Sequence, residues 1–164
     1  MDDRLESMYR RFTWRILSNY VSAWEFEELR NQITDYEQWC ATWCRQAASH
    51  VERGDEALAA GRRRTAGDAY LRAGLFYHWA SFMFSHDQAQ FRAALASMAT
   101  AWEKAAPHVD PPMEILAVPF EHRHSRPLAA RDREQVGLVL VMAIDRIPLE
   151  PLVGENPPQF LAEG

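Results

Sequence analysis

The sequence predicts a mainly α fold, a bundle of about five helices followed by one or two short strands and an irregular tail. Apolar residues recur at helical spacing through the first two thirds of the 164 residues. Prolines at positions 107, 111 and 112 then stop this pattern. Beyond them, only 113–120 and 136–144 have the composition of strands. These observations predict a helical block with a small β addition.

Each expected helix has an apolar stripe, and several follow a capping signal. The stripes lie at residues 5–16, 26–33, 36–51, 65–84 and 91–102. Three pairs match the spacing of a capping box: Ser22 with Glu25, Thr34 with Glu37, and Ser85 with Gln88. Gly54 either breaks the third helix or only weakens it, and Gly61 is expected to end it.

The stretch from 65 to 84 is the most apolar of the predicted helices. Asp68 and Arg72 are four residues apart and can pair on a narrow polar strip. After this strip, apolar groups surround the helix, and a helix that is apolar on all sides is covered on all sides. We therefore expect it at the centre of the fold. The side chains expected in the core are Leu71, Leu75 and Phe82.

Composition and charge limit the organisation of the chain and its partners. Residues 1–110 are expected to form a helical domain, 111–145 a remnant β segment, and 146–164 a disordered tail rich in proline. Hydrophobic residues make up 48% of the chain, which indicates a packed globule. No basic cluster interleaved with aromatics suggests nucleic acid, and no apolar run is long enough to cross a membrane. The start lacks a signal-peptide pattern, so we expect a cytoplasmic protein.

Few residues suggest metal or nucleophilic chemistry. Cys40 and Cys44 share a helix face, but there is no third cysteine and no histidine at zinc-site spacing, so we interpret them as core residues. His122 and His124 lie in an arginine-rich stretch without a carboxylate cluster. No Gly-x-Ser-x-Gly, Gly-x-Gly-x-x-Gly or Walker A motif occurs. We therefore expect no catalytic residue, no metal and no cofactor.

One face of the central helix carries polar-tipped aromatic residues. Tyr70, Tyr77 and His78 lie on this face, with Gly74 at its middle. Such a face can line a pocket, or it can let another helix approach closely. We take Tyr70, Tyr77 and His78 as candidates for a substrate pocket, and ordinary helix packing is the alternative.

Three segments carry a family pattern in a fixed order. They are the run from Gly61 to Phe82, which contains Ala-Tyr-Leu-Arg-Ala-Gly-Leu-Phe-Tyr, then Trp102-Glu-Lys-Ala105, and then Val118-Pro-Phe-Glu121. In this order, over about residues 20 to 121, the chain resembles one group of bacterial and fungal α/β-hydrolases. This group includes dihydroxypseudooxynicotine hydrolase and the heptaketide hydrolases of pigment synthesis. The resemblance implies that the helices form a cap over a hydrolase active site.

The family pattern breaks off after Glu121. A glycine-rich hairpin is expected there, but this sequence has His-Arg-His-Ser-Arg-Pro-Leu. The resemblance places the nucleophilic serine, the acid and the histidine of the family beyond residue 164. It implies a truncated serine hydrolase of small molecules, cutting a carbon–carbon or ester bond beside a carbonyl and inactive alone. A shifted reading frame after Glu121 is our hypothesis for the break.

Two expectations about partners follow. A small-molecule substrate is expected only if the hydrolase domain is present, and exposed apolar surface favours self-association.

The alternative function is a tetratricopeptide-like helical interaction module. Such repeats recur every 34 residues, and no second copy is found at that offset. The cap interpretation is therefore favoured.

Overall fold

The structure is a computed structural model that describes residues 2–119 and 136–142. The tail expected over 146–164 lies outside these residues. The described helices are α1 (Asp3–Leu17), α2 (Ala23–Gln32), η1 (Tyr36–Gln38), α3 (Trp39–Ala59), α4 (Arg63–Ser81), α5 (Gln88–Ala105) and η2 (Ala106–His108), and the strands are β1 (Met113–Pro119) and β2 (Val136–Met142). The prediction of a mainly α fold with about five helices and one or two short strands is confirmed.

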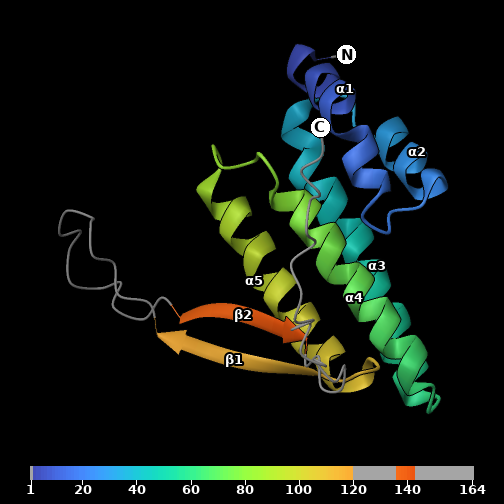
Figure 1. Cartoon of the computed structure of the whole chain (residues 1–164). Helices are drawn as coiled ribbons and strands as arrows, with labels where there is room; N and C mark the ends of the chain where they lie inside the picture. Colours follow the sequence, from blue (N-terminus) through green and yellow to red (C-terminus); the bar gives the residue numbers. More distant parts are fainter. Residues whose placement is uncertain (1, 120–135, 143–164) are drawn as a thin grey trace, which may run out of the picture.

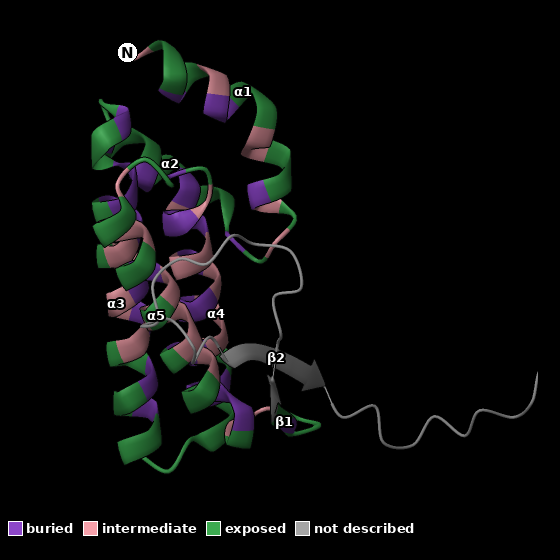
Figure 2. Cartoon of the chain, turned by 90° about the vertical axis from the view of Figure 1, so that its left-hand side faces the viewer, coloured by how far each residue is buried: buried purple, intermediate pink, exposed green. Residues whose placement is uncertain are grey.

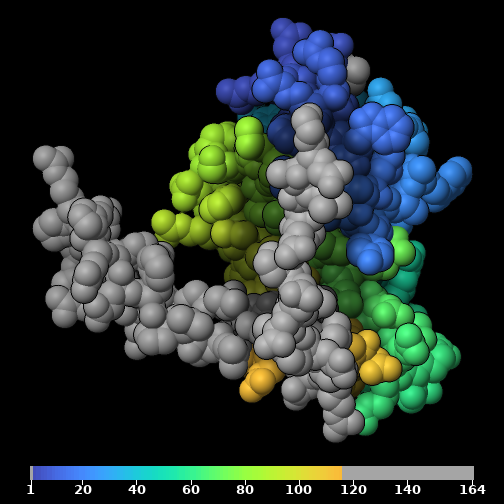
Figure 3. Space-filling model, in the orientation of Figure 1, coloured from blue at the N-terminus to red at the C-terminus, as the bar shows by residue number. Residues whose placement is uncertain are grey.

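Helices α3, α4 and α5 run side by side, and α4 packs against both of its neighbours (Figure 1). Helices α1 and α2 lie at the end of this layer where α3 begins. The turn between α3 and α4 lies at the opposite end, as the space-filling view also shows (Figure 3). The most apolar predicted helix is thus the middle one.

Side-chain caps form at the starts of α1, α2, η1 and α5 but not of α3 and α4, and only one of the three predicted capping boxes forms. Ser22 and Glu25 make a full capping box at α2. At α5 the cap is Asp87 and not Ser85, because the Asp87 carboxylate accepts from the N–H groups of both Ala89 and Gln90 at 3.0 Å. At η1 the cap is likewise an aspartate, Asp35, and not Thr34. A carboxylate at a helix start also interacts favourably with the helix dipole.

Close approach between the three central helices depends on glycine at two positions. Helix α3 continues through Gly54, where a Cβ atom would lie 2.4 Å from Cε1 of Tyr70. A Cβ atom on Gly74 would lie 2.0 Å from Nε1 of Trp102 on α5. Gly54 therefore does not break its helix, and both glycines make room for an aromatic ring of a neighbouring helix.

Buried positions recur along the helices (Figure 2), and their side chains form two clusters, one towards each end of the helical layer. The larger, which we call the aromatic cluster, includes Trp39, Trp43, Phe76 and Trp79, each with 0% exposure. The smaller, which we call the alanine cluster, consists of Ala57, Ala66, Tyr70, Ala105, Ala106 and Met113. The hydrophobic effect of burying large rings is concentrated at the first end.

The predicted core face of α4 is partly wrong. Leu71, Leu75 and Phe82 are only half-buried, whereas Phe76 and Trp79 are completely buried. The reason is that apolar residues surround this helix, so the periodicity does not identify one inner face. The expected pairing of Asp68 with Arg72 is also absent among the described ion pairs, because Arg72 bonds instead to Glu25 on α2.

The two strands form an antiparallel pair with Met113 opposite Met142 and Pro119 opposite Val136. Pro119, which has no N–H to donate to a ladder, is the last described residue of β1. The first residue of β1, Met113, is buried in the alanine cluster and so joins the strand to the helices. No helix of the described residues is both long enough and apolar enough to span a membrane.

Candidate functional site

Tyr70 lies in the alanine cluster, with its ring against the backbone of α3 at Gly54. It is 1% exposed, and its hydroxyl donates to Oδ1 of Asp55 at 2.6 Å. Lys104 on α5 bonds to the same carboxylate oxygen at 2.8 Å, and its Nζ lies 5.2 Å from the centre of the Tyr70 ring. Burial and the Asp55 carboxylate raise the pKa of Tyr70 to about 12. Tyr70 thus joins α3, α4 and α5 through its ring and its hydroxyl.

Tyr77 and His78 lie further along α4, beside the aromatic cluster. Both are half-buried, and the His78 ring contacts the rings of Trp79 and Phe82 at centroid distances of 5.4 Å and 6.0 Å. Burial raises the pKa of Tyr77 and lowers that of His78. The structure therefore places Tyr77 and His78 beside the aromatic cluster and Tyr70 in the alanine cluster, about two helical turns away. None of the three lines the main surface pockets of the described residues.

The middle of this helix face is filled by α5. The indole of Trp102 occupies the space that a side chain at Gly74 would need. The hydroxyl of Ser81, one turn beyond Tyr77, donates to the carbonyl of His78 at 2.9 Å within the same helix. At Gly74, therefore, the face packs against a neighbouring helix.

A polar cluster that the sequence analysis missed joins α2, α3 and α4. Glu25 is its centre: one carboxylate oxygen, Oε2, accepts from the Ser22 hydroxyl at 2.5 Å and from the Arg72 guanidinium. The other oxygen, Oε1, lies 3.1 Å from Nε2 of His50. The cluster opens into a groove of about 670 Å³, whose wall also includes Arg53. Glu25 is thus both a helix cap and a tertiary contact.

Burial sets the charge state of this cluster. His50 is 3% exposed, and burial lowers its pKa to about 4 although the neighbouring Glu25 opposes the shift. Burial raises the pKa of Glu25, but the Ser22 hydrogen bond and the Arg72 charge outweigh this, and the pKa falls below its ordinary value. At neutral pH the cluster therefore holds a neutral imidazole beside a carboxylate–guanidinium pair.

No local signal could have shown this cluster. Glu25 and Arg72 are 47 residues apart, and His50 lies near the end of a predicted stripe. Chemically, the arrangement fits a structural contact: the Ser22 hydroxyl bonds to Glu25 and not to the imidazole. Among the described residues, no serine hydroxyl or cysteine thiol forms a hydrogen bond with a histidine ring. The nucleophile–base pair of a serine hydrolase is therefore not found in this part of the chain.

The two cysteines are free thiols in α3. Cys40 is buried, and its hydrogen bond with Cys44 and its burial raise its pKa. The same hydrogen bond lowers the pKa of half-buried Cys44. No group of three metal-ligating side chains occurs among residues 2–119 and 136–142. His122 and His124 lie outside the described residues.

Comparisons with known proteins identify similarity to hydrolases. The chain is 33% identical over 87 residues to the α/β-hydrolase pydG of Acremonium sp, which covers 53% of this chain and 20% of that protein. It is 32% identical over 99 residues to the α/β-hydrolase xenA of Xenoacremonium sinensis, covering 59% and 23%. It is 30% identical over 87 residues to the α/β-hydrolase gkaG of Penicillium citrinum, covering 53% and 20%. No family model and no solved structure matches.

These comparisons place the similarity at the level of the superfamily. The chain is a distant relative of proteins named α/β-hydrolase over rather more than half of its length. It spans about a fifth of the length of these curated relatives. The structure adds that the described part of the chain is mainly helical, with one antiparallel pair of strands.

Proposed function

We propose that this chain is the N-terminal, helical cap-like part of an α/β-hydrolase-fold serine hydrolase. The observation that carries the proposal is the identity of 30–33% to three proteins named α/β-hydrolase. The family pattern between residues 61 and 82 also supports the proposal. These residues include α4, the middle helix of the layer, so the pattern coincides with one complete structural element. The proposed reaction of the whole enzyme is cleavage of a carbon–carbon or ester bond beside a carbonyl in a small molecule.

Within this proposal, Tyr70, Tyr77 and His78 are the residues of the cap that face substrate. Tyr77 and His78 support this role best, because both are half-buried. Tyr70 would act less directly, since it is buried and its hydroxyl already donates to Asp55 of α3. A cap helix that holds one polar-tipped face towards a pocket would orient a substrate without reacting with it.

The proposal includes inactivity of the chain alone. Hydrolysis by a serine enzyme needs the serine, its base and the oxyanion donors together. The purified chain should therefore hydrolyse an activated ester such as p-nitrophenyl acetate no faster than a denatured sample. Turnover that a fluorophosphonate reagent abolishes would contradict this part of the proposal.

A chimera tests the cap assignment directly. Residues 20–121 of this chain would replace the matched segment of xenA, and labelling of the chimera by a fluorophosphonate probe would be measured. A cap-like segment should leave the hydrolase folded and its serine reactive. If the chimera is folded by circular dichroism but unlabelled, while unaltered xenA is labelled, the segment does not function as this cap.

The tetratricopeptide-like alternative is less well supported. Repeats of that kind stack equivalent helical hairpins. Here the five α-helices of the described residues have 15, 10, 21, 19 and 18 residues, and the first two lie at one end of the other three. Self-association remains part of the proposal, because Trp14, Tyr20 and Trp24 are each at least 75% exposed.

A further inference from the structure

A second hollow, separate from the groove of Glu25, lies between α1, η1 and the loop from α4 to α5. We call it the α1 pocket. Its volume of about 490 Å³ is within the range of small-molecule sites. On α1 the lining residues are Asp3, Arg4, Ser7, Met8, Arg11 and Phe12; Tyr36 of η1 and Met83, Ser85 and His86 of the loop complete the wall. The pocket is built from three segments that are distant in the sequence.

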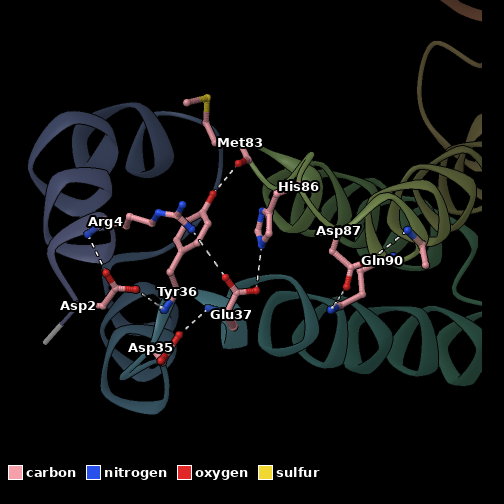
Figure 4. A network of polar contacts seen from close by, with 10 residues as sticks. Asp2, Arg4, Asp35, Tyr36, Glu37, Met83, His86, Asp87 and Gln90 are labelled. Atoms are coloured by element: carbon pink, nitrogen blue, oxygen red, sulfur yellow. Dashed lines mark hydrogen bonds and ion pairs between the residues drawn. The ribbon is translucent and has the colours of Figure 1, made fainter.

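The loop wall of the pocket has an unusual backbone. Met83 has a φ of 61°, in the left-handed region that a side chain other than glycine rarely adopts. The hydroxyl of Tyr36 donates to the Met83 carbonyl at 2.5 Å and holds this conformation in place (Figure 4). The Met83 side chain is 59% exposed. Strained residues held by their surroundings cluster at ligand sites, and exposed methionines adapt to ligands of several shapes.

At one end of the pocket, the polar side chains already have partners. The Arg4 guanidinium lies 5.7 Å from the Tyr36 ring centre and 3.8 Å from Oε1 of Glu37. The other oxygen of Glu37 lies 2.9 Å from Nε2 of His86, whose ring stacks on Tyr36 at 5.6 Å (Figure 4). Glu37 therefore holds both Arg4 and His86, and the charge of Arg4 is already paired.

The other end has an uncompensated cation. Arg11 is seven residues from Arg4 on α1, so both lie on the same face of that helix with Met8 between them. Among the described residues, no carboxylate lies within ion-pair distance of Arg11. A guanidinium at the rim of an apolar pocket can bind a carboxylate through two parallel hydrogen bonds.

We propose that the α1 pocket binds a small aromatic carboxylate. The ring packs against Met8, Phe12 and Tyr36, with Met83 at the side, and the carboxylate pairs with Arg11. This inference goes beyond the hydrolase proposal, because the site lies within the helical part and needs no catalytic domain.

The test uses 2-naphthoate as the probe, titrated into the full chain and followed by amide chemical shifts. At the affinity per atom usual for ligands of this kind, the dissociation constant should be about 1 mM. Shifts should concentrate at the pocket lining, and Arg11→Gln should weaken binding at least about fivefold. Arg10→Gln is the matched control, because Arg10 is exposed on the same helix but lines a different hollow. It should leave the affinity unchanged.

Two further measurements test whether the ligand's charge and the space in the pocket are needed for binding. The neutral 2-naphthamide should bind at least about fivefold more weakly than 2-naphthoate, since it lacks the charge. Ser7→Phe, which fills the pocket from α1, should abolish binding while circular dichroism shows an unchanged helical content. Unsaturated or scattered shifts, equal affinity for the amide, or an equal loss in Arg10→Gln would each overturn the proposal.

Discussion

The two ends of the helical layer are stabilised in different ways. At the end near α1 and α2, the aromatic cluster buries three tryptophans completely, and their rings contact one another. At the end near β1, the alanine cluster contains one large ring, Tyr70, among small residues. Burial of apolar area therefore dominates at the first end, and close approach of helices dominates at the second. Removing a large ring should therefore damage the first end, and adding a methyl group should damage the second.

The largest effect is expected from Trp43→Ala at the aromatic end. Trp43 is 0% exposed, and its ring lies 5.4 Å from those of Trp39 and Phe76. Removing it leaves a cavity that the surrounding rings cannot fill, so the free energy of unfolding should fall by about 3–5 kcal/mol. Urea unfolding followed by circular dichroism measures this change.

The matched control is Trp24→Ala, in which the same side chain is removed from a position that is 75% exposed. This change should alter the free energy of unfolding by about 0.5 kcal/mol or less. If the two variants lose equal stability, the aromatic cluster is not the main source of stability at this end.

A smaller loss of folding stability is expected at acidic pH, and it comes from the buried His50. Its folded pKa is about 4 and its ordinary value is 6.5. Between these values the unfolded chain binds a proton that the folded chain excludes, so stability is full above pH 6.5 and falls as the pH drops towards 4. We expect a loss of about 1–3 kcal/mol over this range.

Unfolding curves at pH 7, 6, 5.5 and 5 would measure this loss before Glu25, whose pKa lies below its ordinary 4.5, begins to contribute. His50→Gln should flatten the pH dependence, because it removes the buried imidazole. An undiminished slope in His50→Gln would show that another group takes up the proton.

At the alanine end, adding a methyl group should be harmful. In Gly54→Ala the new Cβ would lie 2.4 Å and 2.6 Å from two atoms of the Tyr70 ring. Overpacking costs about 1–3 kcal/mol, and the better helix propensity of alanine returns up to about 1 kcal/mol. A net loss of about 1 kcal/mol is expected in urea unfolding. In a Tyr70→Leu background the same change should cost less, and an unchanged cost would contradict the ring contact.

The sequence predicted which helices and strands form better than it predicted which face of a helix is buried. Helix existence followed from apolar spacing, and the composition of residues 113–120 predicted β1. The inner face of α4 could not be predicted, because Leu75 and Phe76 are adjacent and equally apolar, yet only Phe76 is fully buried. Packing against α3 and α5 decides between them, and this information is not local.

The polar contacts were predictable only where they are local. The Ser22–Glu25 capping box followed from a spacing of three residues. The bond from Arg72 to Glu25 did not, since the alternative partner Asp68 is four residues away on the same helix and is equally suitable by spacing. The tertiary fold brings Glu25 to Arg72, and it places His50 against the same carboxylate.

The smallest change in stability is expected from Tyr77→Phe. This variant tests whether this face of α4 lines a pocket. Tyr77 is half-buried beside the aromatic cluster, and its hydroxyl has no hydrogen-bond partner within the described residues. Removing the hydroxyl should therefore change the free energy of unfolding by about 0.5 kcal/mol or less. If the hydroxyl instead bonded to a buried partner, its removal would lower the free energy of unfolding by about 1–3 kcal/mol.

Leu75→Ala is the reference for this measurement, because Leu75 lies on the same helix and is also half-buried. Its loss should fall near the lower end of the range of about 2–5 kcal/mol for leucine truncation, since part of the side chain is already in contact with water. Thermal melts of both variants give the comparison. If Tyr77→Phe is as damaging as Leu75→Ala, the hydroxyl belongs to ordinary interior packing, and Tyr77 should be removed from the proposed substrate face.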